Sequence, residues 1–340
     1  MHFELILPGL AVPSLFLSGH AEAPALPALS ALLGLAGHRW QAPRQLEDLL
    51  AERFGLAGRI PHAGLRRAGE AQPTDDAHWL CCDPVHLHFA RDKLLLADAS
   101  GLAIRRDEAD TLIAGLNELF ADIGRFEAPA PERWYLALTE APRPFFHPLA
   151  DVNGRPVQLF MPEGEDIARW ARLTNEVEVW LYNHPVNAAR EAAGLRTING
   201  VWLWGAGPRD LPLRAPAAQI QADTPFARGL ALAAGATVQA ADSHRAGTTF
   251  AVVDDLRQAA LHHDAAAWLG ALTRLEADWF APLLAALKAR QLRTLSVSAP
   301  GDKHSLQLEI SASSLWKFWR KPRPLAALLA TAPQPTPTTP

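Results

Sequence analysis

The sequence predicts an α/β fold in which a mainly parallel sheet is flanked by helices, with an α+β insert region in the middle of the chain. Two observations support this prediction. Short apolar runs of strand character alternate with periodic helical segments in both terminal parts of the chain. Between them, two apolar runs around the turn-like Ala90-Arg91-Asp92 are typical of neighbouring strands.

Composition and charge are ordinary for a globular protein. The 340 residues are 49% hydrophobic and 20% charged, and the net charge of −4 indicates no polyanionic partner. No apolar run approaches the roughly 18 residues of a membrane span, and Glu4 and Pro8 interrupt the apolar N-terminus, so we expect no membrane association and a cytoplasmic protein. Adjacent Cys81 and Cys82 are expected to be two small buried side chains.

Residues 1–76 are expected to form the first part of the α/β core. Phe3–Leu7 is typical of a buried strand, and two helices are expected near Ala25–Leu35 and Arg44–Phe54. Ala63–Asp76 has no apolar period and contains Gly64, Gly69 and Pro73. It is therefore expected to be an exposed connection.

Residues 77–195 are expected to form the α+β insert. Its predicted elements are strands at His78–Cys82, Lys93–Ala97 and Trp134–Leu138, a helix from Asp107 to Phe120, a structured loop at Phe145–Glu163, a helix from near Glu165, and a short helix that ends at Gly194. The helix from Glu165 must end before Pro185, because the residue preceding a proline avoids helical geometry.

Residues 196–325 are expected to return to the core, and residues 326–340 to form a disordered tail. The predicted elements are strands at Ile198–Trp204, near Thr237, and at Thr248–Val253, Leu292–Val297 and Ser305–Ile310, helices at Pro225–Ala234 and Ala265–Arg290, and a final element at Leu315–Trp319.

An ordered series of short motifs lies between His78 and Ala240. It consists of Asp83-Pro84-Val85-His86-Leu87, Leu116-Asn117-Glu118, Arg133-Trp134-Tyr135-Leu136, Met161-Pro162-Glu163-Gly164, His184-Pro185-Val186-Asn187 with Arg190, and Ile198–Gly205. This series resembles the archaeal-type cofactor-independent phosphoglycerate mutases. With Ala277–Leu283, it is similar also to the proteobacterial phosphoglycerate-mutase-like proteins called regulatory protein RpfE.

The resemblance implies an alkaline-phosphatase-like fold and, in active members, two divalent metals that activate a serine. Such a metal pair needs dense carboxylate and imidazole ligands. The family's first strand ends on an acid, whereas here it ends Leu7-Pro8-Gly9-Leu10, and Ser14 and Ser18 have no acid beside them. We therefore predict a non-catalytic protein with a regulatory or ligand-sensing role, with no catalytic residues, no metal and no cofactor.

An active metal-dependent mutase or phosphatase is the alternative. It would assemble its metals from residues near two strand ends, namely Asp254, Asp255, His263, Asp302 and His304. The competing interpretation is an acid pair at a strand end, a helix cap at Asp264, and a polar hairpin turn at Gly301–His304, in which Lys303 separates the two candidate ligands.

His184, Asn187 and Arg190 recur at spacings of three and could converge on a small anionic or phosphorylated ligand. The alternative is that Asn187 caps the turn after Pro185 and Arg190 makes a surface ion pair. The sequence does not decide between the ligand site and this structural alternative.

Further ligand-binding candidates are Asn199, Trp202 and Trp204, at the carboxyl end of a strand, and Asp83 with His86 after a proline turn. The alternatives are tryptophans packed in the core and a buried histidine bonded to backbone.

The segment Trp316–Arg323 interleaves aromatic and basic residues, a pattern that suits an unidentified protein partner or nucleic acid. Basic stems that lie over apolar surface would give the same pattern, and nucleic acid is not the expected partner.

Overall fold

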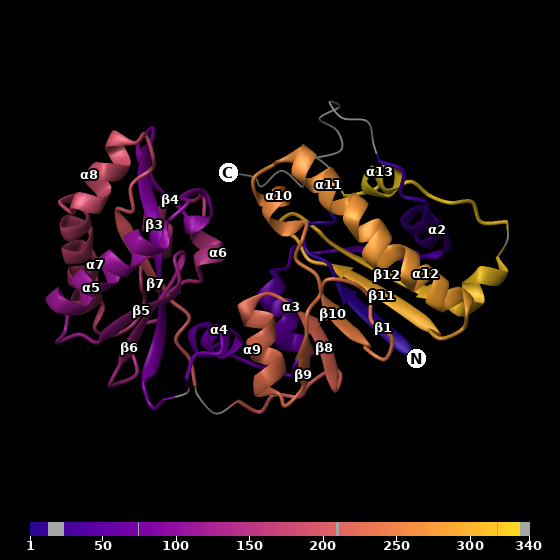
Figure 1. The fold of residues 1–340 in the computed structure, drawn as a ribbon, viewed down its shortest axis with the longest axis horizontal. Helices are drawn as coiled ribbons and strands as arrows, with labels where there is room; N and C mark the ends of the chain where they lie inside the picture. Colours follow the sequence, from indigo (N-terminus) through magenta and orange to yellow (C-terminus); the bar gives the residue numbers. More distant parts are fainter. Residues whose placement is uncertain (13–23, 74, 209–210, 318, 334–340) are drawn as a thin grey trace. The chain divides into compact units, whose positions relative to one another are not determined.

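The chain forms two compact units. In the computed structural model the described residues are 1–12, 24–73, 75–208, 211–317 and 319–333. The core unit combines Met1–Ala57 with Pro212–Pro340, and the insert unit is Gly58–Leu211 (Figure 1). Each unit has its own sheet and its own buried apolar cluster.

The core unit contains a seven-stranded sheet in the order β2-β12-β11-β1-β10-β8-β9. β1 pairs in parallel with β10 and β11, and β8 pairs in parallel with β10 and β9, whereas β12 and β2 are antiparallel. The mainly parallel sheet predicted from the sequence is confirmed. Its strands are β1 (His2–Ile6), β2 (Gly37–Gln41), β8 (Gln219–Ala222), β9 (Thr237–Gln239), β10 (Phe250–Val252), β11 (Thr294–Ala299) and β12 (Ser305–Ser311).

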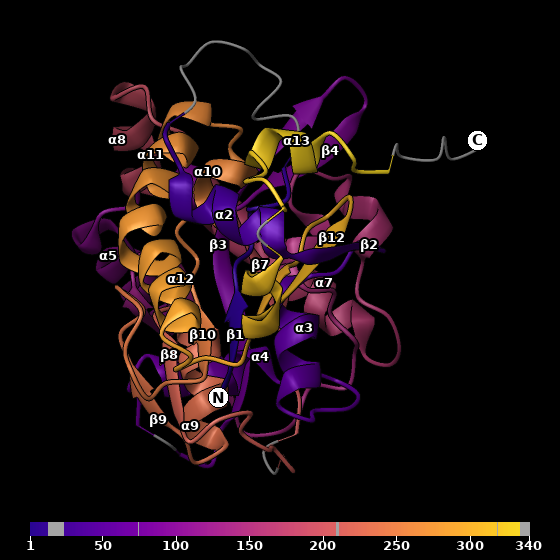
Figure 2. The ribbon, with the colours of Figure 1, turned by 90° about the vertical axis from the view of Figure 1, so that its right-hand side faces the viewer.

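Helices cover both faces of this sheet, as predicted. Their bounds are α2 (Pro27–Leu35), α3 (Leu46–Arg53), α9 (Pro225–Ala233), α10 (Arg257–Leu261), α11 (Ala265–Leu275), the π-helix η3 (Glu276–Phe280), α12 (Ala281–Lys288), the 3-10 helix η4 (Ala312–Trp316) and α13 (Leu325–Leu329). Figure 2 shows α11 and α12 on one side of the strands and α3 on the other.

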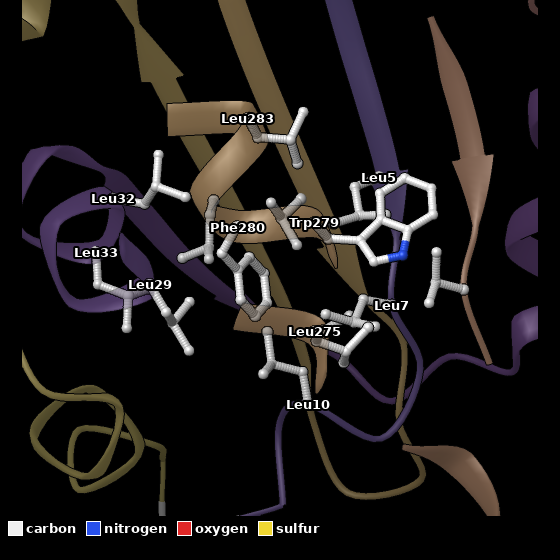
Figure 3. Close-up of a cluster of buried hydrophobic side chains, with 14 of the residues drawn as sticks. Leu5, Leu7, Leu10, Leu29, Leu32, Leu33, Leu275, Trp279, Phe280 and Leu283 are labelled. Carbon is white, nitrogen blue, oxygen red and sulfur yellow. The ribbon is translucent and has the colours of Figure 1, made fainter. Parts of the chain in front are cut away.

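The alternation of side chains along β1 explains this layering. Phe3 and Leu5 point into the cluster formed with α2, η3 and α12, where Leu7 and Trp279 also pack (Figure 3). Glu4 points to the opposite face and pairs with Arg53 of α3, with 2.7 Å between Oε1 and Nε. Successive residues of a strand face opposite sides, so one buried strand anchors both helical layers.

The insert unit is built on an antiparallel sheet around the long strand β3, which pairs with β4, β6 and β7. Its strands are β3 (His78–Ala90), β4 (Lys93–Ala97), β5 (Arg125–Ala130), β6 (Arg133–Leu138) and β7 (Gly200–Trp204). Its helices are α4 (His62–Gly69), α5 (Arg106–Leu119), α6 (Leu149–Val152), α7 (Ile167–Tyr182) and α8 (Pro185–Ala192), with 3-10 turns η1 (Ala99–Gly101) and η2 (Val157–Phe160). Cys81 and Cys82 are buried in β3, as expected.

Two sequence-based expectations differ from the structure. Ala63–Asp76 is not an exposed connection, because α4 occupies its first half and packs on β3. This packing and the pairing of β7 with β3 both lie within the insert unit, Gly58–Leu211, and the domain limits expected from the sequence stay predictions. In the tail, α13 buries Leu325 and Leu328, and residues 334–340 lie outside the described ranges.

The long helix expected over Ala265–Arg290 is interrupted by the π-helix η3. Every helix in the described ranges is too short or too polar to cross a bilayer.

Glu276, at the start of η3, caps α2 from a distance. Its carboxylate accepts hydrogen bonds from the backbone nitrogens of Ala28 (2.5 Å) and Leu29 (3.0 Å), where α2 has no side-chain cap of its own.

Loss of a capping acceptor typically costs about 1 kcal/mol. We therefore expect Glu276→Ala to lower the free energy of unfolding by about 1–2 kcal/mol in urea titrations, and Glu276→Gln to lower it less. Equal stability of the alanine variant and the parent would contradict this capping role.

Candidate functional site

The carboxyl ends of β1, β10 and β11 meet at one edge of the core sheet. Leu7 donates its backbone N–H to Ser298 (2.9 Å), and Val253 donates to Ile6 (2.9 Å), so the pairing continues to the strand ends. In open α/β sheets this edge is the usual place for ligands.

Gly9 turns the chain at this edge with a φ of +84°, and a Cβ there would lie 2.7 Å from the carbonyl oxygen of Leu256. The close approach of two strand ends therefore requires glycine at this position.

An arginine lies among the acids of this edge. Arg257, at the start of α10, pairs with Glu47 of α3, with 3.0 Å between Nη2 and Oε1. Burial lowers the pKa of Arg257, but the charges of Glu47, Asp254 and Asp302 outweigh that effect and raise it. Gln45 donates to Asp302 Oδ1 at 3.2 Å. Arg257 is therefore a fixed cation at the strand ends.

Asp254 follows β10 beside this arginine. Its Oδ1 atom is inaccessible and has no hydrogen-bond partner among the described residues. Burial raises the pKa of Asp254 to about 7; Arg257 lowers it, while Glu47 and Asp255 raise it. A buried carboxyl oxygen without a hydrogen-bond partner is tolerated there because a raised pKa favours the neutral, protonated form of the group.

The described residues at this edge do not fit a pair of divalent metals. Among the described residues, no three or more histidine, cysteine or acidic side chains are grouped so that they could hold a metal ion. The segment Leu7-Pro8-Gly9-Leu10 at the end of β1 contains no acid, and Arg257 already supplies a positive charge at this edge. Ser14 and Ser18 lie outside the described residues.

The other suggested ligands have structural roles or are exposed. Asp264 caps α11 by accepting from Ala267 N–H at 3.0 Å, as the capping alternative predicted. β11 and β12 form an antiparallel hairpin, so Gly301–His304 is the turn that the sequence suggested. His304 lies against Trp40, with 6.2 Å between ring centroids, and His263 is exposed.

Asp83 and Trp204 come together in the insert unit. Asp83 is 2% exposed and forms a two-pronged ion pair with Arg66 of α4, at 2.7 and 2.8 Å. Trp204 Nε1 donates to Asp83 at 2.8 Å, and the Trp134 backbone nitrogen donates at 3.2 Å.

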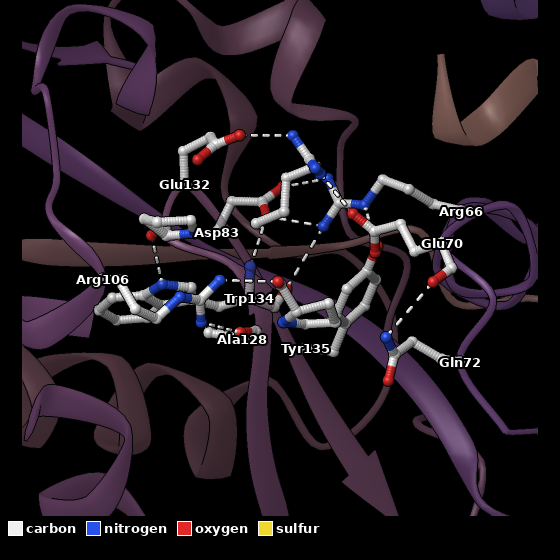
Figure 4. A network of polar contacts seen from close by, with 12 residues as sticks. Arg66, Glu70, Gln72, Asp83, Arg106, Ala128, Glu132, Trp134 and Tyr135 are labelled. Atoms are coloured by element: carbon white, nitrogen blue, oxygen red, sulfur yellow. Dashed lines mark hydrogen bonds and ion pairs between the residues drawn. The ribbon is translucent and has the colours of Figure 1, made fainter. Parts of the chain in front are cut away.

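The Arg66 guanidinium also donates to Tyr135 (2.7 Å), whose hydroxyl donates to Glu70 (2.6 Å), as Figure 4 shows. Burial raises the pKa of Tyr135, although Arg66 opposes the rise. Each charged group in this network has a protein partner. Because Arg66 of α4 bonds to Asp83 of β3 and Tyr135 of β6, the network holds α4 against the sheet.

His184, Asn187 and Arg190 are all bonded to protein. His184 is the N-cap of α8 and accepts from Val186 N–H at 3.2 Å. The Asn187 amide donates to Leu181 O (2.8 Å) and Ile198 O (2.7 Å) and accepts from Ile198 N–H (2.8 Å).

Arg190 is 1% exposed and pairs with Glu108 of α5 at 2.8 Å, so its ion pair is buried rather than on the surface. It also donates to the carbonyls of Arg196 (2.8 Å) and Leu102. These partners fix α8 to α5.

His86 of β3 and Trp202 of β7 lie near Asn199, the residue that precedes β7. The Asn199 amide accepts from Leu87 N–H (2.7 Å) and donates to Leu87 O (2.8 Å). His86 Nδ1 bonds to Thr197 O (2.9 Å), and burial lowers its pKa. Trp202 Nε1 donates to His147 O (2.8 Å). The polar atoms named here all have protein partners. Ligand binding at these residues stays a prediction.

Three site residues were not predicted from the sequence: Arg66, Glu47 and Arg257. The spacing of Arg257, three residues after Asp254, was a local signal of an acid with a cation beside it. No such signal exists for Glu47, which lies 210 residues from Arg257 in the chain.

Comparisons with known proteins support the mutase resemblance over short segments. No family model matches the chain. The 2,3-bisphosphoglycerate-independent phosphoglycerate mutase of Methanothrix thermoacetophila is 36% identical over 61 residues, which are 18% of this chain and 16% of that enzyme. The enzyme of the same name from Methanosarcina barkeri is 30% identical over 69 residues, 20% of this chain and 17% of its own. The chain is similar there to cofactor-independent phosphoglycerate mutases. Less than a fifth of either relative's length is matched.

A solved structure extends the likeness to most of the chain. The PH0037 protein of Pyrococcus horikoshii superposes with a TM-score of 0.55, covering 91% of this chain and 87% of its own, at 14% identity. This likeness concerns the fold alone.

Asp254 makes stability depend on pH in a defined direction. Its pKa is about 7 in the folded chain against an ordinary value of 3.8, so between these values the folded state holds a proton that the unfolded state lacks. The free energy of unfolding therefore falls as pH rises through this window. We expect Asp254→Asn to remove this effect, so that the variant gains up to roughly 3 kcal/mol relative to the parent between pH 5 and pH 8.

Urea titrations at both pH values measure this difference. Asp92→Asn, at an exposed acid of the insert unit, is the control and should follow the parent. Parallel pH profiles for Asp254→Asn and the parent would show that the folded chain does not protect the proton.

The buried Arg190–Glu108 pair predicts a large stability effect. Arg190→Leu leaves the buried Glu108 carboxylate with only the exposed Arg105 at 3.5 Å, and breaking a buried pair typically costs about 3–5 kcal/mol. Arg169→Leu, at a half-exposed arginine of α7, should change stability by less than about 1 kcal/mol. Denaturant titrations followed by circular dichroism give both values. A small effect of Arg190→Leu would favour a ligand-binding role for Arg190.

Proposed function

We propose that this chain is a phosphoglycerate-mutase-like protein without metal-dependent phosphoryl transfer, and that it has a regulatory or ligand-sensing role. The observation that carries the proposal is the position of Arg257, paired with Glu47 and beside Asp254 at the carboxyl edge of the parallel sheet. The short matches to the mutases and the ordered motifs support descent from that family.

Electrostatics supports the loss of metal chemistry. In-line phosphoryl transfer by two metals requires carboxylates that are ionised and free to coordinate. Here Glu47 is bonded to Arg257, and Asp254 has a pKa of about 7. A divalent cation would have to displace a guanidinium and remove a proton before binding, so metal affinity should be low.

A regulatory or ligand-sensing role is compatible with a fold of this kind that lacks metal chemistry. The resemblance to the RpfE proteins supports it, and a small anionic or phosphorylated molecule is the ligand class that the relatives' names suggest. Under this proposal such a molecule binds to the chain and is not converted into a product.

An active mutase or phosphatase is the competing proposal. The unpartnered Oδ1 atom of Asp254 favours it, because an oxygen of this kind could accept a metal. The two proposals differ in metal content and turnover.

The test uses the purified full chain with added Mn²⁺. We expect substoichiometric bound metal after dialysis, by elemental analysis, and no interconversion of 3- and 2-phosphoglycerate. Binding of 3-phosphoglycerate without turnover, seen by calorimetry, would support sensing. Turnover that disappears in Asp254→Ala and persists in Asp264→Ala, a cap on α11, would overturn the proposal.

A further inference from the structure

Two tryptophans of the core unit are largely exposed. Trp316 at the end of η4 is 70% exposed, and Trp319 in the following turn is 66% exposed. The turn is ordered by hydrogen bonds from Lys317 N–H to Ser314 O (3.0 Å) and from Arg320 N–H to Lys317 O (2.9 Å). Large apolar side chains placed on the surface in this way commonly mark an interaction site.

Positive charge surrounds these indoles. Residues 288–293, at the end of α12, contain three basic residues and no acid, and residues 316–323 contain four and no acid, in a chain of net charge −4. The two segments adjoin, because η4 packs on α12 and Ala312 donates to Arg293 O at 2.8 Å. Figure 1 shows η4 in yellow beside the end of α12. We call residues 288–293, 316–317 and 319–323 the Trp–cation surface.

The body of the unit holds this surface in place. Arg320 donates to Leu35 O (2.9 Å) at the end of α2, and Arg323 donates to Ala327 O (3.1 Å). Gly34 lets the backbone of Lys321 approach α2, since a Cβ at residue 34 would lie 2.3 Å from the Lys321 carbonyl oxygen. The surface is therefore preorganised, which lowers the entropic cost of binding.

The alternative that basic stems merely cover apolar surface does not explain the exposure. Stems that sheltered the indoles would leave them buried, whereas about two thirds of each tryptophan remains accessible. Tryptophan and arginine are also the residues that most often dominate the binding energy of protein interfaces.

The chemistry favours a carboxylate-rich partner over nucleic acid. The guanidinium of Arg290 lies over the Trp316 ring, 5.9 Å from its centroid, and so takes part of the ring face on which a base would stack. A guanidinium in that position keeps its N–H edge available for a carboxylate, which it can bind with two hydrogen bonds.

We propose that the Trp–cation surface docks an acidic, extended segment of a partner protein. Carboxylates of the segment meet the cations of α12 and of the turn, and its apolar side chains pack on the two indoles. This inference goes beyond the proposed function and does not depend on it, since an active enzyme could carry the same surface.

The probe is a fluorescein-labelled 16-residue peptide that repeats Glu-Asp-Leu, titrated with the full chain and followed by anisotropy. We expect binding that weakens with added salt. We also expect the double variant Trp316→Ala/Trp319→Ala to weaken binding at least about tenfold. Its matched control is Phe89→Ala/Tyr182→Ala, which removes exposed aromatics (76% and 80% exposed) from the insert unit and should leave binding unchanged.

A second variant, Lys317→Glu/Lys321→Glu, keeps both indoles and should also lose binding. Thermal melts of each variant confirm folding. A peptide with Gln and Asn in place of the acids should not bind. Equal binding by the tryptophan variant, or tighter binding of oligothymidylate or of phosphatidylserine vesicles than of the acidic peptide, would overturn the proposal.

Discussion

Parallel pairing of β1 with β10 on one side and β11 on the other sets the geometry of the core unit. Because strands in parallel end at the same edge, this pairing brings residues from the beginning, middle and end of the sequence together there. The same pairing buries β1 on both faces, so Phe3 and Leu5 anchor one helical layer while Glu4 reaches α3 on the other. Fold and candidate site thus depend on one strand.

The charges that meet at this edge have to be balanced, because carboxylates brought together away from water repel one another. In a two-metal enzyme the metals provide the balance. In this chain Arg257 provides a positive charge for Glu47, and the raised pKa of Asp254 leaves that carboxyl group largely protonated below pH 7. A guanidinium cannot activate a serine as a metal ion does, but it keeps the strand ends together. This balance allows the strand ends to lie together with charges that the chain itself supplies.

Much of the fold could be predicted because its signals are local. The apolar run of β10 and the periodic face of α5 are both contained in short windows of sequence. α4 was missed because it buries Arg67, a residue that looks exposed in sequence. In the structure, its guanidinium lies 3.4 Å from the centre of the Trp79 ring and pairs with Glu127. The polar edge strand β2 was missed because most of its residues are exposed.

The site was harder to predict because its partners are distant in sequence. The residue types of Asp83, Asn187 and Arg190 suggested that they bind a ligand. The sequence does not reveal that their hydrogen-bonding groups are instead bonded to Arg66, Ile198 and Glu108, respectively. Likewise, the absence of an acid at Leu7-Pro8-Gly9 could be seen in the sequence, whereas the pairing of Arg257 with Glu47 requires the folded chain.

We propose that Arg257, rather than a metal ion, balances the acidic side chains at the strand ends. The most direct test is anomalous diffraction from crystals of the full chain grown with Mn²⁺. The account predicts no manganese peak within coordinating distance of Asp254 or Asp302, with the Arg257–Glu47 ion pair intact. A strong anomalous peak bound by Asp254, with Arg257 displaced, would contradict it.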